Sequence, residues 1–151
     1  MSSIHNSQIV EQCYGKKVAE ASLSQEDTLG REDTQISITF EDLNKTLILT
    51  ACPTCCDESW FDLRYGDLDQ MVGKRLAGIN MHKWDPTVES NDGDPQIEPS
   101  GIQEYDKYHK IVMSFEDETE LVILLINSSN GYYDGYLSIS IEDEMNDNVM
   151  Y

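Results

Sequence analysis

Basic side chains are scarce in this sequence. Lys and Arg together number 10 against 29 Asp and Glu in 151 residues, which gives a formal net charge of −19 at pH 7. A field of that sign repels nucleic-acid polymers and anionic membranes, so we expect neither of them as a partner. A small anionic ligand is still compatible with the charge, because a closed site can use backbone N–H groups and a few local cations.

Long apolar runs and a secretory signal pattern are also missing. No stretch approaches the roughly 20 apolar residues that a membrane-spanning helix needs, and the opening residues do not follow the signal-peptide pattern. We therefore expect a soluble intracellular protein with one domain by length. Hydrophobic residues make up 39%, below the usual globular share, so the core must be economical.

Motifs that carry catalysis are absent as well. The chain has no phosphate-binding glycine loop, nucleophile elbow or paired-histidine metal motif. Its histidines, His5, His82 and His109, are scattered, and the acid pair Glu41-Asp42 falls in an expected hairpin turn, where solvated carboxylates are ordinary. We expect a protein that is not an enzyme and that needs no cofactor.

Only four cysteines are present, namely Cys13, Cys52, Cys55 and Cys56. The stretch "CPTCC" contains a C-x-x-C pair, which in other proteins ligates zinc or acts in redox chemistry. A zinc site needs four ligands, and the sequence has no second C-x-x-C and no nearby histidine pair. We expect reduced thiols that pack as small apolar groups, with a metal or redox role as the alternative.

What the sequence does contain is an internal repeat. "GKKVA" at 15–19 recurs as "GKRLA" at 73–77, and "ISITFEDLNKTLILT" at 36–50 is answered by "KIVMSFEDETELVILL" at 110–125. Apolar residues alternate with polar ones before each "FED" turn, which predicts two β-hairpins. "LVILLI" is apolar throughout and predicts a central strand covered on both faces. A further strand is predicted at 136–141.

These patterns predict an α+β fold, mainly an antiparallel β-sheet built from two similar hairpin-containing halves with one or two short helices. One helix is expected at 67–72, capped by Asp67 and ended by Gly73, and a second helical turn at 59–63. We expect a flexible tail at 1–8, a single domain at 9–142 with an acidic loop excursion at 84–104, and an acidic tail at 143–151.

The segment "NSSNGYYDGY" at 127–136 is longer than a chain reversal requires. A tight turn needs only Asn130-Gly131, whereas the polar stretch continues to Gly135. Amides can bind base edges, tyrosines can stack on bases, and glycines allow close approach of the backbone to a ligand. The simpler alternative is that Tyr132 and Tyr133 pack on a sheet edge while the amides satisfy the turn.

The segment "CCDESWFDL" at 55–63 raises the same question. Trp60 and Phe61 are suited to anchoring this segment in the core. The cations nearest in sequence are Arg64, Lys74 and Arg75, and a bound phosphate would have Arg64 as its best-placed partner. Each cation is equally compatible with a solvated surface position.

Together these segments resemble a known family. A Cys-Cys pair followed by Ser-Trp-Phe, a Gly-Lys strand and "NSSNGYY" is similar to the Thoeris anti-defence sponge proteins of phages and their uncharacterised phage relatives. The resemblance implies a homo-oligomer in the cytoplasm of the infected host cell that sequesters a cyclic nucleotide signal, of the cyclic ADP-ribose or cyclic oligonucleotide type, without cleaving it. Carried over by motif, the ligand-binding residues would be Asn127, Ser128, Ser129, Asn130, Gly131, Tyr132 and Tyr133, with Trp60 and Phe61 near the site or beneath it. As the cations nearest in sequence, Arg64 and Arg75 are the expected phosphate partners.

Two departures from the family pattern concern charge. Ile126 stands where a basic residue is expected before "NSSN", and Asp134-Gly135 replaces a glycine pair. Both make the site less favourable for an anion. The alternative hypothesis is therefore an acidic viral structural or protein-interaction module on the same fold, such as a mimic of nucleic-acid charge.

Overall fold

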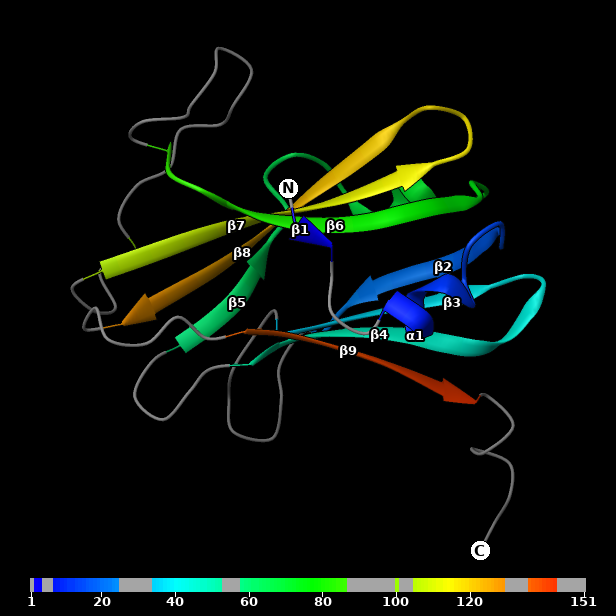
Figure 1. Ribbon diagram of the computed structural model, residues 1–151, viewed down its shortest axis with the longest axis horizontal. Coiled ribbons are helices and arrows are strands. Elements are labelled where there is room, and N and C mark those ends of the chain that lie inside the picture. Colours follow the sequence, from blue (N-terminus) through cyan, green and yellow to red (C-terminus); the bar gives the residue numbers. More distant parts are fainter. Residues whose placement is uncertain are drawn as a thin grey trace, which may run out of the picture.

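Two antiparallel sheets pack face to face around one apolar core (Figure 1). The computed structural model describes residues 2–3, 7–24, 34–52, 58–86, 100, 105–129 and 136–143. Two helical elements lie wholly within those ranges, the short helix α1 (Ser7–Glu11) and the 3-10 helix η1 (Leu68–Met71). The predicted α+β fold, mainly antiparallel β, is confirmed.

The four-stranded sheet has the order β2-β3-β4-β9, and the five-stranded sheet has the order β1-β6-β7-β8-β5. In the first sheet the strands are β2 (Val18–Leu23), β3 (Gln35–Phe40), β4 (Leu43–Cys52) and β9 (Tyr136–Asp143). In the second they are β1 (Ser2–Ser3), β6 (Leu76–Trp84), β7 (Tyr105–Phe115), β8 (Glu120–Ser129) and β5 (Glu58–Asp62). Both predicted hairpins are present, as β3-β4 and β7-β8.

The two halves of the chain exchange their last strands. Each half contributes a three-stranded meander, β2-β3-β4 from the first and β6-β7-β8 from the second. The first half then sends β5 across to pair with β8, and the second half sends β9 across to pair with β4. Each sheet is therefore completed by the other half. The halves cannot form two independent units.

The repeated Gly-Lys segments meet where the halves touch. Lys17 and Arg75 form an antiparallel bridge, and the backbone bonds around it come in matched pairs. In the first pair, Gly15 N donates to Leu76 O and Gly73 N donates to Val18 O, both at 2.8 Å. In the second pair, Val18 N donates to Lys74 O at 2.9 Å and Leu76 N donates to Lys16 O at 3.1 Å. This arrangement is a local two-fold symmetry. It requires glycine, because Gly15 and Gly73 have φ of +78° and +86°.

The core follows the predicted alternation. The apolar residues before both "FED" turns are buried, and so is β8 on both faces. Leu121, Ile123 and Leu125 belong to the core between the sheets, whereas Leu124 and Ile126 belong to a second apolar cluster on the outer face of the five-stranded sheet. The prediction of a central, doubly covered strand is confirmed.

The predicted helical turn at 59–63 is wrong, because this segment forms β5. Asp57, Glu58 and Ser59 carry the local signature of a helix start, but pairing with β8 prevails over that weak propensity. At 67–72 the structure has η1, with Leu68 and Met71 buried. Asp67 occupies the N-cap position without a side-chain cap bond, and Val72 is 44% exposed.

The chain ends differ in part from the expected tails. Within 1–8, Ser2–Ser3 pair with β6 as β1, and α1 begins at Ser7. Asp143, expected to open the C-terminal tail, ends β9 opposite Lys45. Residues 144–151 and most of 84–104 lie outside the described ranges. None of the helices in the described ranges is long and apolar enough to cross a membrane.

Candidate functional site

The last residues of β8 are polar and buried. Asn127, Ser128 and Ser129 are at most 2% exposed. Alternate residues of a strand face opposite sides, so Asn127 shares the core side with Leu125. Its amide Nδ2 donates to Ser59 Oγ at 2.8 Å, which ties the end of β8 to the start of β5. The first residues of the candidate loop are thus held by the fold itself.

Ser128 faces the opposite, outer side and joins a polar network. Ser100 donates from its backbone N and from Oγ to the two carboxylate oxygens of Asp106, both at 2.7 Å, and Ser100 Oγ lies 3.3 Å from Ser128 Oγ. Partial burial raises the pKa of Asp106, but the hydrogen bonds from Ser100 outweigh it and hold the pKa below its usual range. This network anchors one point of the 84–104 excursion to the sheet.

An aromatic row crosses the outer face of the five-stranded sheet. Trp84, Tyr108, Ile126 and Trp60 are successive cross-strand partners on β6, β7, β8 and β5. Trp84 and Tyr108 meet edge to face with ring centroids 6.1 Å apart. Tyr65, which follows β5, packs on Trp84 in the same way at 6.4 Å. Both tryptophans of the chain therefore lie on this face.

Two cations accompany the row. Lys110 Nζ lies 4.3 Å from the Trp84 ring centroid and 5.1 Å from that of Tyr65, within the range of cation–π attraction. Arg64 Nε pairs with Asp62 Oδ2 at 2.8 Å. Desolvation and the charge of Asp106 raise the pKa of Tyr108, while the charge of Arg64 lowers it. Because Arg64 affects this pKa, it lies within electrostatic range of the aromatic row.

The predicted site residues are distributed unequally. Asn127, Ser128 and Ser129 end β8, and Trp60 lies beside them on β5, with Arg64 just beyond. Phe61 points into the core and is 1% exposed, so it supports the site from beneath. Asn130, Gly131, Tyr132 and Tyr133 lie outside the described residues.

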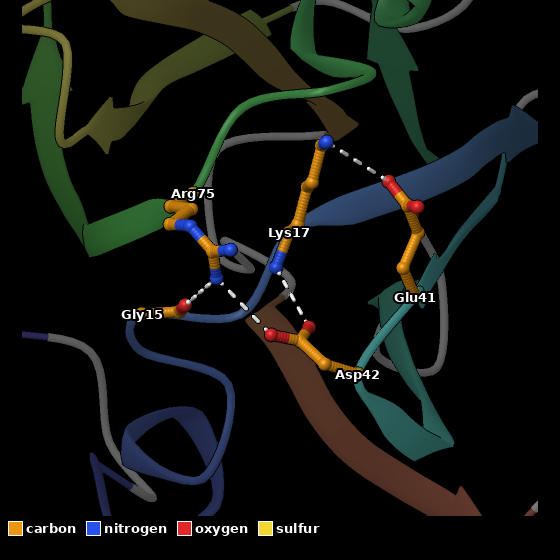
Figure 2. Close-up of polar contacts among 5 residues, drawn as sticks. All are labelled: Gly15, Lys17, Glu41, Asp42 and Arg75. Carbon is orange, nitrogen blue, oxygen red and sulfur yellow. Dashed lines mark hydrogen bonds and ion pairs between the residues drawn. The ribbon is translucent and has the colours of Figure 1, made fainter.

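Arg75 is not brought to this group. It precedes β6 at the opposite end of the sheet, where its guanidinium donates to the Gly15 carbonyl at 2.7 Å and to Asp42 at 3.1 Å (Figure 2). Along β8, the seven residue steps from Glu120 to Asn127 correspond to roughly 23 Å. Arg75 holds the two halves together and does not reach the polar end of β8.

Four residues of this face, Trp84, Tyr108, Lys110 and Tyr65, were not among the site residues predicted from the sequence. The signal was present as alternation, since Trp84 and His82 share one face of β6 and Tyr108 and Lys110 share one face of β7. Recognising it required the register between β6 and β7, which the sequence pattern does not supply.

The described cysteines agree with the thiol prediction. Cys13 and Cys52 are free thiols, while Cys55 and Cys56 lie outside the described residues. Across the described ranges, no group of three or more His, Cys, Asp or Glu side chains is arranged to hold a metal ion.

Comparison with known proteins finds a viral relative. Over 106 residues the chain is 37% identical to "Uncharacterized protein L278" of Acanthamoeba polyphaga mimivirus, an alignment that covers 69% of this chain and 75% of that protein. No family model matches the chain, and no solved structure matches it. At this identity and coverage, the chain belongs to the same viral protein family as the mimivirus protein.

Proposed function

We propose that this protein is a virus-encoded immune-evasion protein that captures a small cyclic nucleotide in the host cytoplasm and holds it without cleaving it. The observation that carries the proposal is the composition of one sheet face. Both tryptophans, Tyr108, Arg64 and Lys110 gather there beside the buried polar end of β8. This face thus holds both tryptophans and two of the ten basic side chains of the chain, alongside the carboxylates of Asp62 and Asp106.

The chemistry of these groups suits a nucleotide. An aromatic face stacks on a base with about 1–3 kcal/mol per base, independent of sequence. The guanidinium of Arg64 can bind phosphate oxygens in place of Asp62, because a surface ion pair of this kind is weak. Asn127 and the two serines hold the start of the candidate loop in place, which lowers the entropic cost of ordering the rest of that loop around a ligand.

Capture requires tight binding and no bond breaking. A sequestering protein acts by mass action, so it must be present in amounts comparable to its ligand. The homo-oligomer implied by the resemblance to phage sponge proteins belongs to this proposal, since a neighbouring subunit could close the outer face over the ligand.

Calorimetry against cyclic ADP-ribose isomers and cyclic oligonucleotides tests the proposal. Because both tryptophans lie on the proposed face, tryptophan fluorescence gives a second readout on the same samples. Arg64→Met should weaken binding about tenfold by removing a charge-assisted contact. The matched control is Lys17→Met, which breaks a surface ion pair with Glu41 at the other end of the molecule and should leave binding unchanged. Absence of heat and of fluorescence change for every compound contradicts the proposal.

An acidic interaction module is the second candidate, and Ile126 favours it. The resemblance expects a cation at this position, whereas Ile126 is buried between Tyr108 and Trp60 in the aromatic row. A module of this kind would form a salt-sensitive stoichiometric complex with a basic host protein. Size-exclusion chromatography with a purified basic partner at low and high salt distinguishes it from nucleotide capture.

A further inference from the structure

Carboxylates flank the aromatic row on the outer face of the five-stranded sheet. Glu58 and Asp106 lie opposite Ser128 on one side of the row. Asp62 lies opposite Leu124 on the other side. These two positions of β8 are each two residues from the residue that β8 contributes to the row, so the carboxylates share the face of its rings. The aromatic row is thus bordered by negative charge.

The cations of this face are fewer, and they are engaged. Arg64 is bound by Asp62 at 2.8 Å, and Lys110 lies over aromatic rings. Burial raises the pKa of Tyr108 most, and the negative charge of Asp85 adds to that effect. Among the described residues, carboxylates therefore outnumber cations around the row. A face of this kind attracts a cationic group and repels an anionic one.

The aromatic rings already hold one cation. Lys110 Nζ lies 4.3 Å from the ring centroid of Trp84 and 5.1 Å from that of Tyr65, which is the geometry of cation–π attraction. Lys110 is half-buried, and its flexible stem allows the ammonium to move into water when another cation approaches. The rings are therefore suited to a side-chain cation of a partner, with Lys110 as its competitor within the chain.

The indole N–H of Trp84 needs an acceptor. Trp84 is only 5% exposed, and its Nε1 has no hydrogen-bond partner within the described part of the chain. The same holds for the buried Nδ1 of His82, two residues away on the same face. Native proteins rarely leave such atoms unpaired without a bound molecule. Since an indole N–H can only donate, the missing group must carry an acceptor such as a carbonyl oxygen.

We infer that this face binds an extended basic segment of a partner protein. A carbonyl oxygen of that segment accepts from Trp84 Nε1, while its lysine or arginine side chains contact the rings and the flanking carboxylates. A basic polypeptide carries acceptors and cations on one chain, so it satisfies both requirements. The inference rests on the second candidate function, the acidic interaction module, and adds where that module binds. The net charge of −19 favours the same kind of partner.

A blocked peptide of three arginines separated by glycines is the direct probe. Binding is followed by calorimetry and by tryptophan fluorescence, at low and at high salt. The wild-type protein should bind this peptide saturably, with an affinity that falls as salt rises, and should not bind the peptide with glutamine in place of arginine. Absence of saturable binding of the arginine peptide overturns the inference.

Two lysine variants test the rings. Lys110→Met removes the cation that occupies them and should tighten binding of the arginine peptide about fivefold. Lys83→Met is the matched control, because Lys83 is exposed and has the opposite parity to Trp84 on β6. The same loss of charge on the other face should change binding by less than about twofold. Equal responses of the two variants contradict the inference.

Two glutamate variants test the flanking carboxylates. Glu58→Gln should weaken binding of the arginine peptide about threefold, because Glu58 is exposed beside the row. Glu20→Gln removes the same charge from an exposed position of β2 in the other sheet and should leave the affinity unchanged. An equal loss in both variants would show general attraction to an acidic protein and would rule out this face.

Trp84→Phe tests the carbonyl contact, since it removes the indole N–H and keeps a ring. It should weaken binding of the arginine peptide but not of spermine, which carries cations without a carbonyl oxygen. An equal effect on both ligands overturns the contact with a polypeptide. Should Trp84→Phe fail to fold, the lysine and glutamate pairs decide.

The inference and the proposed functions fail separately. Peptide binding that depends on Lys110 and Glu58, without binding of any cyclic nucleotide, supports the inference and removes nucleotide capture. Binding of a basic protein that is unaffected by Lys110→Met and Glu58→Gln supports the second candidate function and removes this face as its site.

Discussion

Arg75 and Asp42 come from different halves of the chain and form an ion pair at 3.1 Å beside the local two-fold axis (Figure 2). Asp42 also accepts the backbone N–H of Lys17 at 3.0 Å, and Arg75 donates to the Gly15 carbonyl. One acid of an ordinary hairpin turn thus connects the two repeats. Its role is structural, although Glu41-Asp42 alone suggested a solvated turn.

Asp42→Asn should lower the Tm at neutral pH and reduce the loss of stability in acid. The backbone N–H of Lys17 is the main cause of the lowered pKa of Asp42, burial opposes it, and Arg75 adds to it. A carboxyl with a lowered folded-state pKa stabilises the fold above its unfolded pKa of about 3.9, and this contribution is lost as the pH falls through the folded-state value. Tm measured from pH 7 to 2.5 tests this.

The control is Asp69→Asn, at an exposed acid in η1. It removes the same charge without touching the contact between the halves, and should follow the wild-type curve. Identical curves of Tm against pH for the Asp42 and Asp69 variants would show that the Arg75–Asp42 ion pair adds no stability beyond that of an ordinary surface carboxylate.

Ser59→Ala should destabilise the protein by about 1–3 kcal/mol, because it leaves the buried Asn127 amide without the acceptor it has in β5. Chemical denaturation of the single variants and of the double variant with Asn127→Ala gives the coupling energy of the pair. Ser140→Ala, at an exposed position of β9, should change stability by less than about 0.5 kcal/mol. A coupling energy near zero contradicts the buried pair.

Phe61→Ala and Trp60→Ala should separate stability from binding. Phe61 is buried between the sheets, and its truncation should cost about 3–5 kcal/mol of unfolding free energy. Trp60 is half-buried on the outer face, so its truncation should cost less stability but should weaken the proposed nucleotide binding. Denaturation midpoints and calorimetry on both variants check this. A larger stability loss at Trp60 than at Phe61 would reverse the assignment of the two faces.

Cys13 should resist alkylation in the native state. It is fully buried, and desolvation raises the pKa of its thiol to about 11, so at pH 8 almost no reactive thiolate forms. Because the unfolded thiol ionises near pH 9, the stability that Cys13 contributes is complete below that pH and is lost as the pH rises toward about 11. Mass spectrometry should find this position unmodified until denaturant is added. Rapid native labelling would contradict the burial.

The hairpins and the central strand were predictable because their signals are local. The alternation of apolar and polar residues around Ile38 and Met113 predicts which face of β3 and of β7 is buried. The continuous apolar run LVILLI predicts that β8 is covered on both faces. Strand exchange was not predictable, because Glu58 pairs with Ser128 seventy positions away and nothing near Glu58 encodes that partner. The same limitation produced the mistaken helical turn at 59–63.

The candidate site was predictable only in part, for the same physical reason. Asn127 and Trp60 stand out in the sequence as an amide and an aromatic residue in polar surroundings. Trp84 and Lys110 do not stand out, because their importance arises from register across two strands. Arg75 was placed with the site by sequence proximity to Arg64, but the intervening chain crosses from β5 to the far end of β6.

The most direct test of capture is depletion and recovery of the ligand. A known amount of the tightest-binding cyclic nucleotide is mixed with the protein, the protein-free filtrate is assayed, and the protein fraction is then heat-denatured and analysed by mass spectrometry. Stoichiometric loss from the filtrate followed by full recovery of the unchanged molecule is the predicted result. A filtrate that keeps the ligand, or recovery of a cleaved product, would contradict capture without cleavage.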